Sequence, residues 1–366
     1  MSPSAKKCNS DDATTGVTAE EEGVGLSSAW WWALVALAAA GGIVFYLLTI
    51  PKTLPASELP AHEPDLANGK YMFFAGGCAE CHAKPLAKCK DTKTEDPTRL
   101  GGGRCLKTDF GVFHVPNISP DKETGIGTWT TLDFVNAMKR GIGPDGTHLY
   151  PAFPYASYQR MTKEDLIDLK AYLDTLPAVQ NEVPPHQLTF PYNIRRGVGL
   201  WQLLYIDGRT FKPDPQKSVE LNRGAYLVEG PGHCGECHTS RNFLGATMPS
   251  AAFAGAHNPE GKGRIPNITP SHDGIGDWSE EEIVEFLQTG TTPDFDVVGG
   301  LMASVQENLA KLTPEDRTAI AAYLKSLPPR EDAVPRKKSG KDHDTDEEGD
   351  TGDEETGTEP GPSTVE

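Results

Sequence analysis

Two pentapeptides in the sequence carry cysteine and histidine at a spacing that suits covalent attachment of a cofactor. They are residues 78–82 (CAECH) and 234–238 (CGECH). On a helical turn, positions i, i+3 and i+4 share one face. Two cysteine sulfurs can then form thioethers to the vinyl groups of one haem, while the following histidine turns its imidazole to the iron. The predicted attachment residues are Cys78, Cys81, Cys234 and Cys237, and the predicted iron ligands are His82 and His238.

Other uses of a Cys-x-x-Cys pair fit this sequence poorly. A thioredoxin-like pair belongs near a βαβ pattern, which flanks neither motif. A zinc ribbon joins two such pairs about 15–20 residues apart, whereas the stretch from Cys81 to Cys234 is far longer. The motifs therefore predict two covalently bound haem c groups.

The 366 residues leave room for two or three domains. The formal net charge of −18 is concentrated at the ends of the chain. Residues 331–366 carry 13 acidic and 4 basic side chains and few hydrophobic ones, which predicts a disordered acidic tail. Residues 1–28 are polar and predict a second disordered tail. A basic patch with interleaved aromatic residues is missing from the sequence, which excludes a nucleic-acid binder.

The stretch 29–50 (AWWWALVALAAAGGIVFYLLTI) has no charged residue. At about 1.5 Å per residue it is long enough to cross a bilayer of roughly 30 Å, and aromatic residues at its ends suit membrane interfaces. We expect a single transmembrane anchor. The alternative is a cleaved signal peptide, whose apolar region is shorter and ends at small residues. Since bacteria attach c-type haem outside the inner membrane, we expect a cytoplasmic N-terminus and periplasmic haem domains.

The haem motifs lie inside a larger internal repeat. Residues 116–120 (PNISP) match 266–270 (PNITP), and 125–129 (GIGTW) match 274–278 (GIGDW). Each copy also ends in a predicted amphipathic helix that follows Thr162 or Thr313. Two copies indicate tandem domains, which we place at 62–180 and 216–330. The linker 181–215 is rich in proline, but apolar residues at 194–205 predict a short helix packed between the domains. The alternative is a helix that covers one domain only.

A low-spin haem needs a sixth ligand, and methionine sulfur is a common one. In the second domain the candidate is Met302, which we expect in a loop before the closing helix. The corresponding place in the first domain holds Phe153, so the candidate there is Met161 at the start of its closing helix. The remaining alternatives in this domain are Met138, His148 and His114.

Two further residue pairs carry predictions. Trp129 and Trp278 occupy equal places in the repeat, and each indole N–H could hold a haem propionate or simply pack in the core. Cys89 and Cys105 flank an insertion that the second domain lacks. In an oxidising compartment they predict a disulfide, with two free thiols as the alternative.

From about residue 62 to 330 the chain resembles the bacterial membrane-anchored dihaem cytochromes c. The resemblance rests on the two Cys-x-x-Cys-His motifs, the paired PNI and GIG-x-W segments, and residues 150–155 (YPAFPY). It implies an all-α fold of two tandem class I cytochrome c domains, with three main helices wrapped on each haem. The chain is also similar to cytochrome subunits that accept electrons from periplasmic alcohol, aldehyde and sugar-acid dehydrogenases, which typically carry three haem motifs and a C-terminal anchor.

The leading functional hypothesis is an electron carrier with redox partner proteins on both sides. The donor would be a dehydrogenase or a quinol-side protein, and the acceptor an oxidase or a soluble cytochrome. The alternative is a dihaem redox enzyme of thiosulfate dehydrogenase or peroxidase type, with an open or labile haem in the first domain. Phe153, where similar domains have methionine, is the feature that favours it. A third hypothesis is a structural subunit of a respiratory complex.

Overall fold

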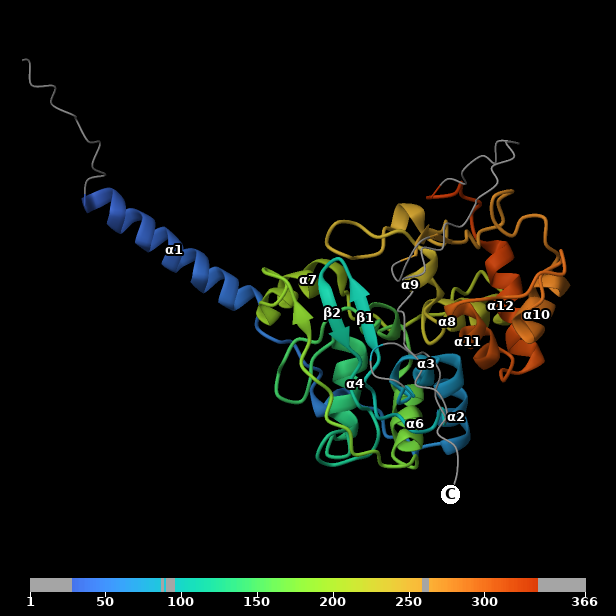
Figure 1. Cartoon of the computed structure of the whole chain (residues 1–366), viewed down its shortest axis with the longest axis horizontal. Coiled ribbons are helices and arrows are strands. Elements are labelled where there is room, and N and C mark those ends of the chain that lie inside the picture. The colour runs from blue at the N-terminus through green and yellow to red at the C-terminus, as the bar shows by residue number, and fades with distance from the viewer. Residues whose placement is uncertain (1–27, 87–88, 90–95, 259–262, 335–366) are drawn as a thin grey trace, which may run out of the picture.

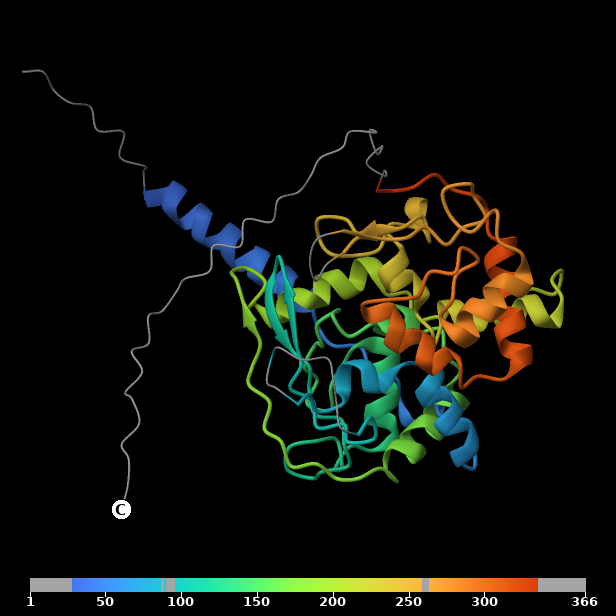
Figure 2. The ribbon, with the colours of Figure 1, turned by 45° about the vertical axis from the view of Figure 1, so that its right-hand side comes forward.

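The computed structural model describes residues 28–86, 89, 96–258 and 263–334. Helix α1 (Ser28–Leu48) projects from a body of two helical domains, with the second domain beside the first (Figures 1 and 2). One helix, Ala29–Leu48, is long and apolar enough to cross a membrane, and none of it is buried. The predicted tail 1–28 lies outside the described residues except for Ser28, the first residue of α1.

Each domain repeats the same order of helices. The prediction of an all-α fold of two tandem cytochrome c domains is confirmed for the domains and their helices, although short strands are also present. The first domain contains α2 (Leu66–Ala75), α3 (Cys78–His82), α4 (Thr131–Arg140), α5 (Tyr155–Tyr158) and α6 (Lys163–Leu173). The second contains α8 (Val219–Glu229), α9 (Cys234–His238), α10 (Glu280–Thr289), α11 (Leu301–Leu309) and α12 (Pro314–Ser326). The linker holds α7 (Val198–Tyr205). Short 3₁₀ turns lie at Ala56–Glu58, Arg195–Gly197 and Pro249–Ala251.

Short strands accompany the helices, although the sequence pattern did not predict them. Strands β1 (Cys105–Thr108) and β2 (Gly111–His114) form an antiparallel hairpin, and β3 (Gln187–Leu188) of the linker adds to β2. Strands β4 (Ala256–His257) and β5 (Arg264–Ile265) pair in the second domain. Two to four residues are too few to show a reliable period of two, so these strands are defined only by their pairing.

Side-chain caps start the closing helices at the predicted residues. Thr162 Oγ1 accepts a hydrogen bond from the Asp165 amide at 3.1 Å, and Thr313 Oγ1 accepts one from the Asp316 amide at 3.2 Å. Each bond satisfies one of the amides that a helix N-terminus leaves without an intrahelical partner. The repeat therefore preserves the residues that begin α6 and α12.

The first and last helices of each domain cross closely, α2 on α6 and α8 on α12, because glycine stands at both crossings. A Cβ on Gly69 would lie 2.1 Å from the carbonyl oxygen of Asp168, and one on Gly224 would lie 1.9 Å from that of Ala319. In the first domain Asp168 also holds α2, since its Oδ2 accepts from Asn68 Nδ2 at 2.7 Å. These crossings fix the helices that flank each haem motif.

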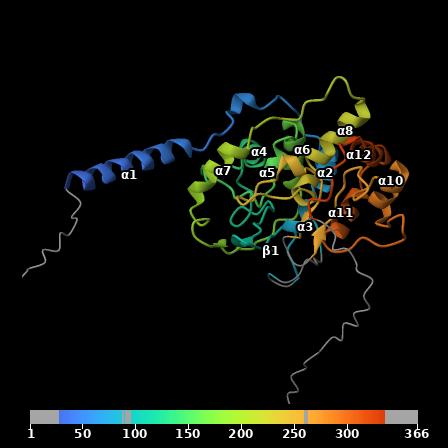
Figure 3. The same ribbon diagram turned by 90° about the horizontal axis from the view of Figure 1, so that it is seen from above.

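The linker helix α7 contacts both domains, as predicted, so the alternative of a helix on one domain is wrong. Gln202 Nε2 donates to the Gly141 carbonyl of the first domain at 2.9 Å. Trp201 Nε1 donates to the Leu244 carbonyl of the second domain at 3.1 Å. Seen from above, α7 also lies at the end of α1 (Figure 3). The helix therefore contacts α1 and both domains.

The predicted acidic tail begins later than residue 331. The Arg264 guanidinium pairs with Asp332, and the Ala333 amide donates to the Ala254 carbonyl at 2.9 Å. Residues 331–334 are therefore packed on the second domain, and the rest of the predicted tail, 335–366, lies outside the described residues. The ion pair of the buried Asp332 carboxylate and the backbone bond of Ala333 hold these four residues although only two of them are hydrophobic.

The close approach of α8 and α12 at Gly224 predicts that a methyl group added there lowers the stability of the protein. Gly224→Ala forces α8 and α12 apart, and we expect a loss of stability of about 1–3 kcal/mol, as for other overpacked sites. The measurement is thermal unfolding of the haem-loaded full chain in detergent, followed by circular dichroism. Gly197→Ala is the control, because a Cβ there meets nothing within 4 Å. Equal melting temperatures for the two variants would contradict the prediction.

Candidate haem sites

Both Cys-x-x-Cys-His motifs form a single helical turn, α3 and α9. The residue before each turn has a left-handed backbone, with φ of 56° at Gly77 and 41° at His233. Cys78, Cys81 and Cys234 are half-buried, and Cys237 is exposed. The predicted sulfur and imidazole groups are thus brought to one turn in each domain, as thioether attachment requires.

Each motif histidine is held in one tautomer. His82 Nδ1 lies 2.9 Å from the carbonyl oxygen of Pro116, and His238 Nδ1 lies 2.8 Å from that of Pro266. A carbonyl oxygen only accepts, so Nδ1 carries the hydrogen and donates it. Burial lowers the pKa of His82 to about 4 and also lowers the pKa of His238. Both rings are therefore neutral at pH 7, with the lone pair of Nε2 available to a metal, and the residues fit a haem iron.

The paired PNI segments hold the proline carbonyls in place. Asn117 Nδ2 donates to the Val179 carbonyl at 2.6 Å, while its Oδ1 accepts from the Ser119 amide at 2.9 Å. In the second domain Asn267 Nδ2 donates to the Arg330 carbonyl at 2.8 Å. Each asparagine thus ties the loop that orients the histidine to the chain beyond the closing helix. The repeat preserves these asparagines for that reason.

Met161 is 1% exposed and belongs to the same packed cluster as Cys78. Its backbone carbonyl accepts from Lys139 Nζ at 2.8 Å. The same ammonium donates to the Gln159 carbonyl at 2.6 Å and to Thr210 Oγ1 at 2.8 Å, so all three of its hydrogens are used. Burial lowers the pKa of Lys139 to about 8. The sequence reasoning missed this lysine, which fixes the segment that presents Met161.

Met302 lies in the first turn of α11, so its expected position in a loop is wrong. Gly300, with φ of 60°, turns the chain immediately before the helix. Met302 is half-buried against the cluster of the second domain, which also includes Cys234 and Trp278. The helix forms because Leu301, Val305 and Leu309 recur at helical spacing over one face.

The other candidate iron ligands in the first domain have hydrogen-bonding or packing roles in the structure. His148 is buried, with Nδ1 2.6 Å from Gln202 Oε1 and Nε2 2.8 Å from the Thr49 carbonyl, so both ring nitrogens have partners. Met138 is a buried core residue of α4. His114 Nδ1 donates to the carbonyl of Pro185 at 2.9 Å.

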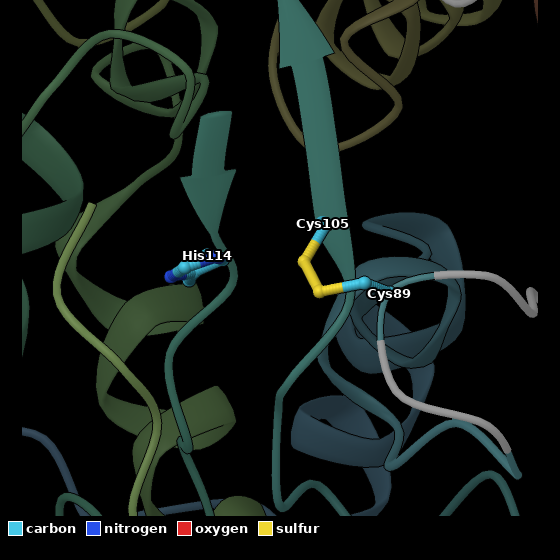
Figure 4. Close-up of side chains that lie close together, drawn as sticks. All are labelled: Cys89, Cys105 and His114. Carbon is cyan, nitrogen blue, oxygen red and sulfur yellow. A yellow bond between two sulfur atoms is a disulfide. The ribbon is translucent and has the colours of Figure 1, made fainter. Parts of the chain in front are cut away.

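Cys89 and Cys105 form a disulfide with an S–S distance of 1.94 Å. The ligand atoms of these cysteines and His114 lie within 4.8 Å of one another (Figure 4). The metal-binding form of cysteine is the thiolate. Since both sulfurs are in the disulfide, this group closes the insertion and offers no thiolate to a metal.

Trp129 and Trp278 are both half-buried beside the cluster of their own domain. Trp278 packs edge-on against Phe286, with ring centroids 5.6 Å apart. Core packing is therefore one role of this indole. A contact of either tryptophan with a haem propionate stays a prediction.

Equivalent tyrosines join the two domains at their closing helices. The Tyr71 hydroxyl donates to Asp316 Oδ2 at 2.5 Å, and the Tyr226 hydroxyl donates to Asp165. Each hydroxyl also accepts the amide of the other domain's capping threonine, 3.1 Å to Thr313 and 3.2 Å to Thr162. The interface is thus built twice from the same repeat positions, which gives it an approximate twofold symmetry.

The haem motifs themselves take part in this interface. Glu80 Oε1 accepts from Asn308 Nδ2, and Glu236 Oε1 accepts from Ser157 Oγ, both at 2.9 Å. Burial raises the pKa of Glu80 to about 7.

Tyr158 bridges the motifs, since its hydroxyl donates to the Gly76 carbonyl at 3.3 Å and its ring stacks on His233 at 5.4 Å. The sequence did not lead us to predict the contacts of Tyr158 or those of Tyr71 and Tyr226. The equivalent positions of Tyr71 and Tyr226 in the repeat could have indicated the interface between the domains.

Comparisons with known proteins agree with this geometry. The family model for cytochrome c matches residues 66–177 and 222–328. A "Diheme cytochrome c-type" protein of Cereibacter sphaeroides is 50% identical over 264 residues, covering 72% of this chain and 86% of the relative.

Two relatives have longer chains. The fructose dehydrogenase cytochrome subunit of Gluconobacter japonicus is 39% identical over 75% of this chain and 54% of its own length. The cytochrome c subunit of alcohol dehydrogenase (quinone) from Gluconacetobacter polyoxogenes is 36% identical over 76% of this chain and 60% of its own. With two matching domains and a relative aligned over most of its length, the chain belongs to the cytochrome c family.

Proposed function

We propose that this chain binds two haem c groups and passes single electrons between a donor and an acceptor protein. The observation that supports this most is the pair of Cys-x-x-Cys-His turns, each with a histidine Nε2 free for iron, joined across one interface by Tyr158. A haem bound at each turn supplies a reversible one-electron iron couple.

The residues around the motifs would hold the cofactors and exclude water. The four motif cysteines form the thioethers, and His82 and His238 are the proximal ligands. Met161 and Met302 are the proposed sixth ligands, because each packs in the cluster that contains the first cysteine of its motif. Methionine opposite histidine raises the reduction potential.

The names of the relatives suggest which redox partners to propose. Fructose, alcohol and gluconate dehydrogenases have cytochrome subunits similar to this chain. The proposed donor is therefore a periplasmic dehydrogenase or a quinol-side protein, and the acceptor is an oxidase or a soluble cytochrome. Helix α1, uncharged and unburied, serves as an inner-membrane anchor with the N-terminus cytoplasmic and the haem domains periplasmic.

A dihaem redox enzyme is the second candidate, because Phe153 stands where a methionine ligand is expected. Phe153 packs edge-on against Tyr155 and tilted on Tyr158, with centroids 6.1 and 5.6 Å away. Such an enzyme needs an open iron site in the first domain. The buried thioether of Met161 favours the carrier, since it offers a ligand within the same cluster.

Leucine substitution tests the sixth ligands. Met161→Leu and Met302→Leu keep the apolar volume but remove the sulfur, so each should turn one low-spin haem high-spin and remove part of the methionine-to-iron charge-transfer band. The measurement is the EPR and visible spectrum of the oxidised full chain. Met138→Leu, in the core of α4, is the control and should leave both signals intact. A high-spin haem in the unmodified chain would instead support the enzyme.

Phenylalanine substitution tests the interface. Tyr226→Phe removes the hydroxyl that serves both Asp165 and the Thr162 amide, leaving a half-buried carboxylate short of a donor. We expect a loss of stability of about 1–3 kcal/mol and slower electron equilibration between the haems after pulsed reduction.

Tyr172→Phe is the control for this test, because its ring packs on Phe73 and its hydroxyl has no partner among the described residues. Identical unfolding and equilibration rates in both variants would refute the role of the tyrosine bridge.

A further inference from the structure

A cavity of about 190 Å³ lies where α1 joins the body of the protein. Its wall combines the chain at the end of α1, the C-terminal end of α4 and helix α7 with the residue that follows it. The residues that matter for its chemistry are Ile50, Lys52, Arg140, Leu203 and Ile206. Two of them are cationic and three are apolar, and none of the described residues that line the cavity is acidic.

Arg140 brings a positive charge to the cavity wall, and no ion pair compensates it within the described part of the chain. Its Nε is buried and has no hydrogen-bond partner among the described residues. Its guanidinium lies close against the backbone, because a Cβ on Gly208 would meet Nη1 at 2.1 Å. Leaving a buried polar group without a partner is costly. An oxyanion in the cavity would relieve that cost, and the planar guanidinium fork suits phosphate oxygens.

Apolar side chains of α1 and of the linker meet at the cavity, whose wall includes Leu48 of α1 and Leu203 of α7. Large exposed hydrophobic side chains gather along this part of the linker, namely Phe190, Tyr192, Ile194, Leu203 and Leu204. Exposed apolar patches of this kind mark interaction sites. Because α1 is the segment proposed to enter the bilayer, the lipid surface is the partner adjacent to this patch.

Arg196 fixes the cavity at the level where α1 would leave the membrane. Its Nη2 donates to the Tyr46 carbonyl at 3.1 Å, its Nε donates to Thr49 Oγ1 at 3.0 Å, and the guanidinium lies 4.3 Å from the Tyr46 ring. Tyrosine suits the headgroup region of a bilayer. The cavity residues Ile50 and Lys52 follow directly after this fixed point in the chain.

We propose that this cavity binds the headgroup of an anionic phospholipid from the leaflet that α1 enters. Arg140 and Lys52 pair with the phosphate, and the acyl chains lie along Ile50, Leu203 and the exposed linker side chains. The site rests on the proposed membrane anchor. It would hold the two domains at a fixed height and orientation on the membrane.

The test uses the haem-loaded full chain in detergent, titrated with short-chain phosphatidylglycerol, short-chain phosphatidylcholine or inorganic phosphate while the melting temperature is recorded. We expect phosphatidylglycerol alone to stabilise the protein. Arg140→Gln should weaken this binding about tenfold, because it removes the charge-assisted hydrogen bonds that the guanidinium would donate to the phosphate. Arg99→Gln, an exposed arginine on another loop of the first domain, is the matched control and should bind normally.

Three results would overturn the site: equal stabilisation by both lipids, stabilisation by inorganic phosphate alone, or unchanged binding by Arg140→Gln. Flotation with vesicles of phosphatidylcholine, with or without phosphatidylglycerol, tests the anchor separately. A chain that floats with neither vesicle refutes the anchor, whereas one that floats with both but lacks lipid selectivity in the titration refutes the lipid site alone.

Discussion

Each motif histidine can offer its Nε2 to a metal only in one tautomer, and a single proline carbonyl selects that tautomer in both domains. The carbonyl of Pro116 is itself held from two sides. Asn117 ties its loop to Val179, and the backbone of Gly102, with φ of +66°, packs so closely that a Cβ would lie 2.4 Å from the Pro116 carbonyl carbon. The amide of Gly102 also donates to the His82 carbonyl at 2.8 Å. Residues far from the motif therefore determine what the motif can bind.

The contact between the domains also depends on residues that the repeat provides twice. A tandem repeat supplies two copies of each surface, so a contact that forms in one direction also forms in the reverse direction. Tyr71 and Tyr226 form such a pair of contacts, because each hydroxyl binds a carboxylate in the first turn of the other domain's closing helix. The motif glutamates also bind across the interface, Glu80 to Asn308 and Glu236 to Ser157. These paired contacts bring the two motifs together, and the linker helix α7 and Tyr158 add contacts that have no repeated counterpart.

Local features of the chain were predictable from the sequence, and contacts between distant segments were not. The motifs, the capping threonines and the linker helix follow from short-range spacing and propensity, and the structure confirms their places. Met302 was expected in a loop, although the apolar residues of the helix that carries it have a helical period. Lys139 was unremarkable in sequence because its three acceptors come from residues 20 or more positions away. A buried lysine can be predicted only when the acceptors around its ammonium are known.

One chain of hydrogen bonds connects the end of α1 with the core of the first domain. The Thr49 carbonyl meets His148, the same imidazole meets Gln202, and Gln202 Nε2 donates to the Gly141 carbonyl. Because Gln202 lies on α7, whose Trp201 is bonded to the second domain, a displacement of α1 acts on both domains at once. All of these groups except Trp201 are buried, so water cannot easily replace the bonds. A flexible tether after α1 would let the domains rotate freely relative to this helix, whereas these bonds fix their orientation to it.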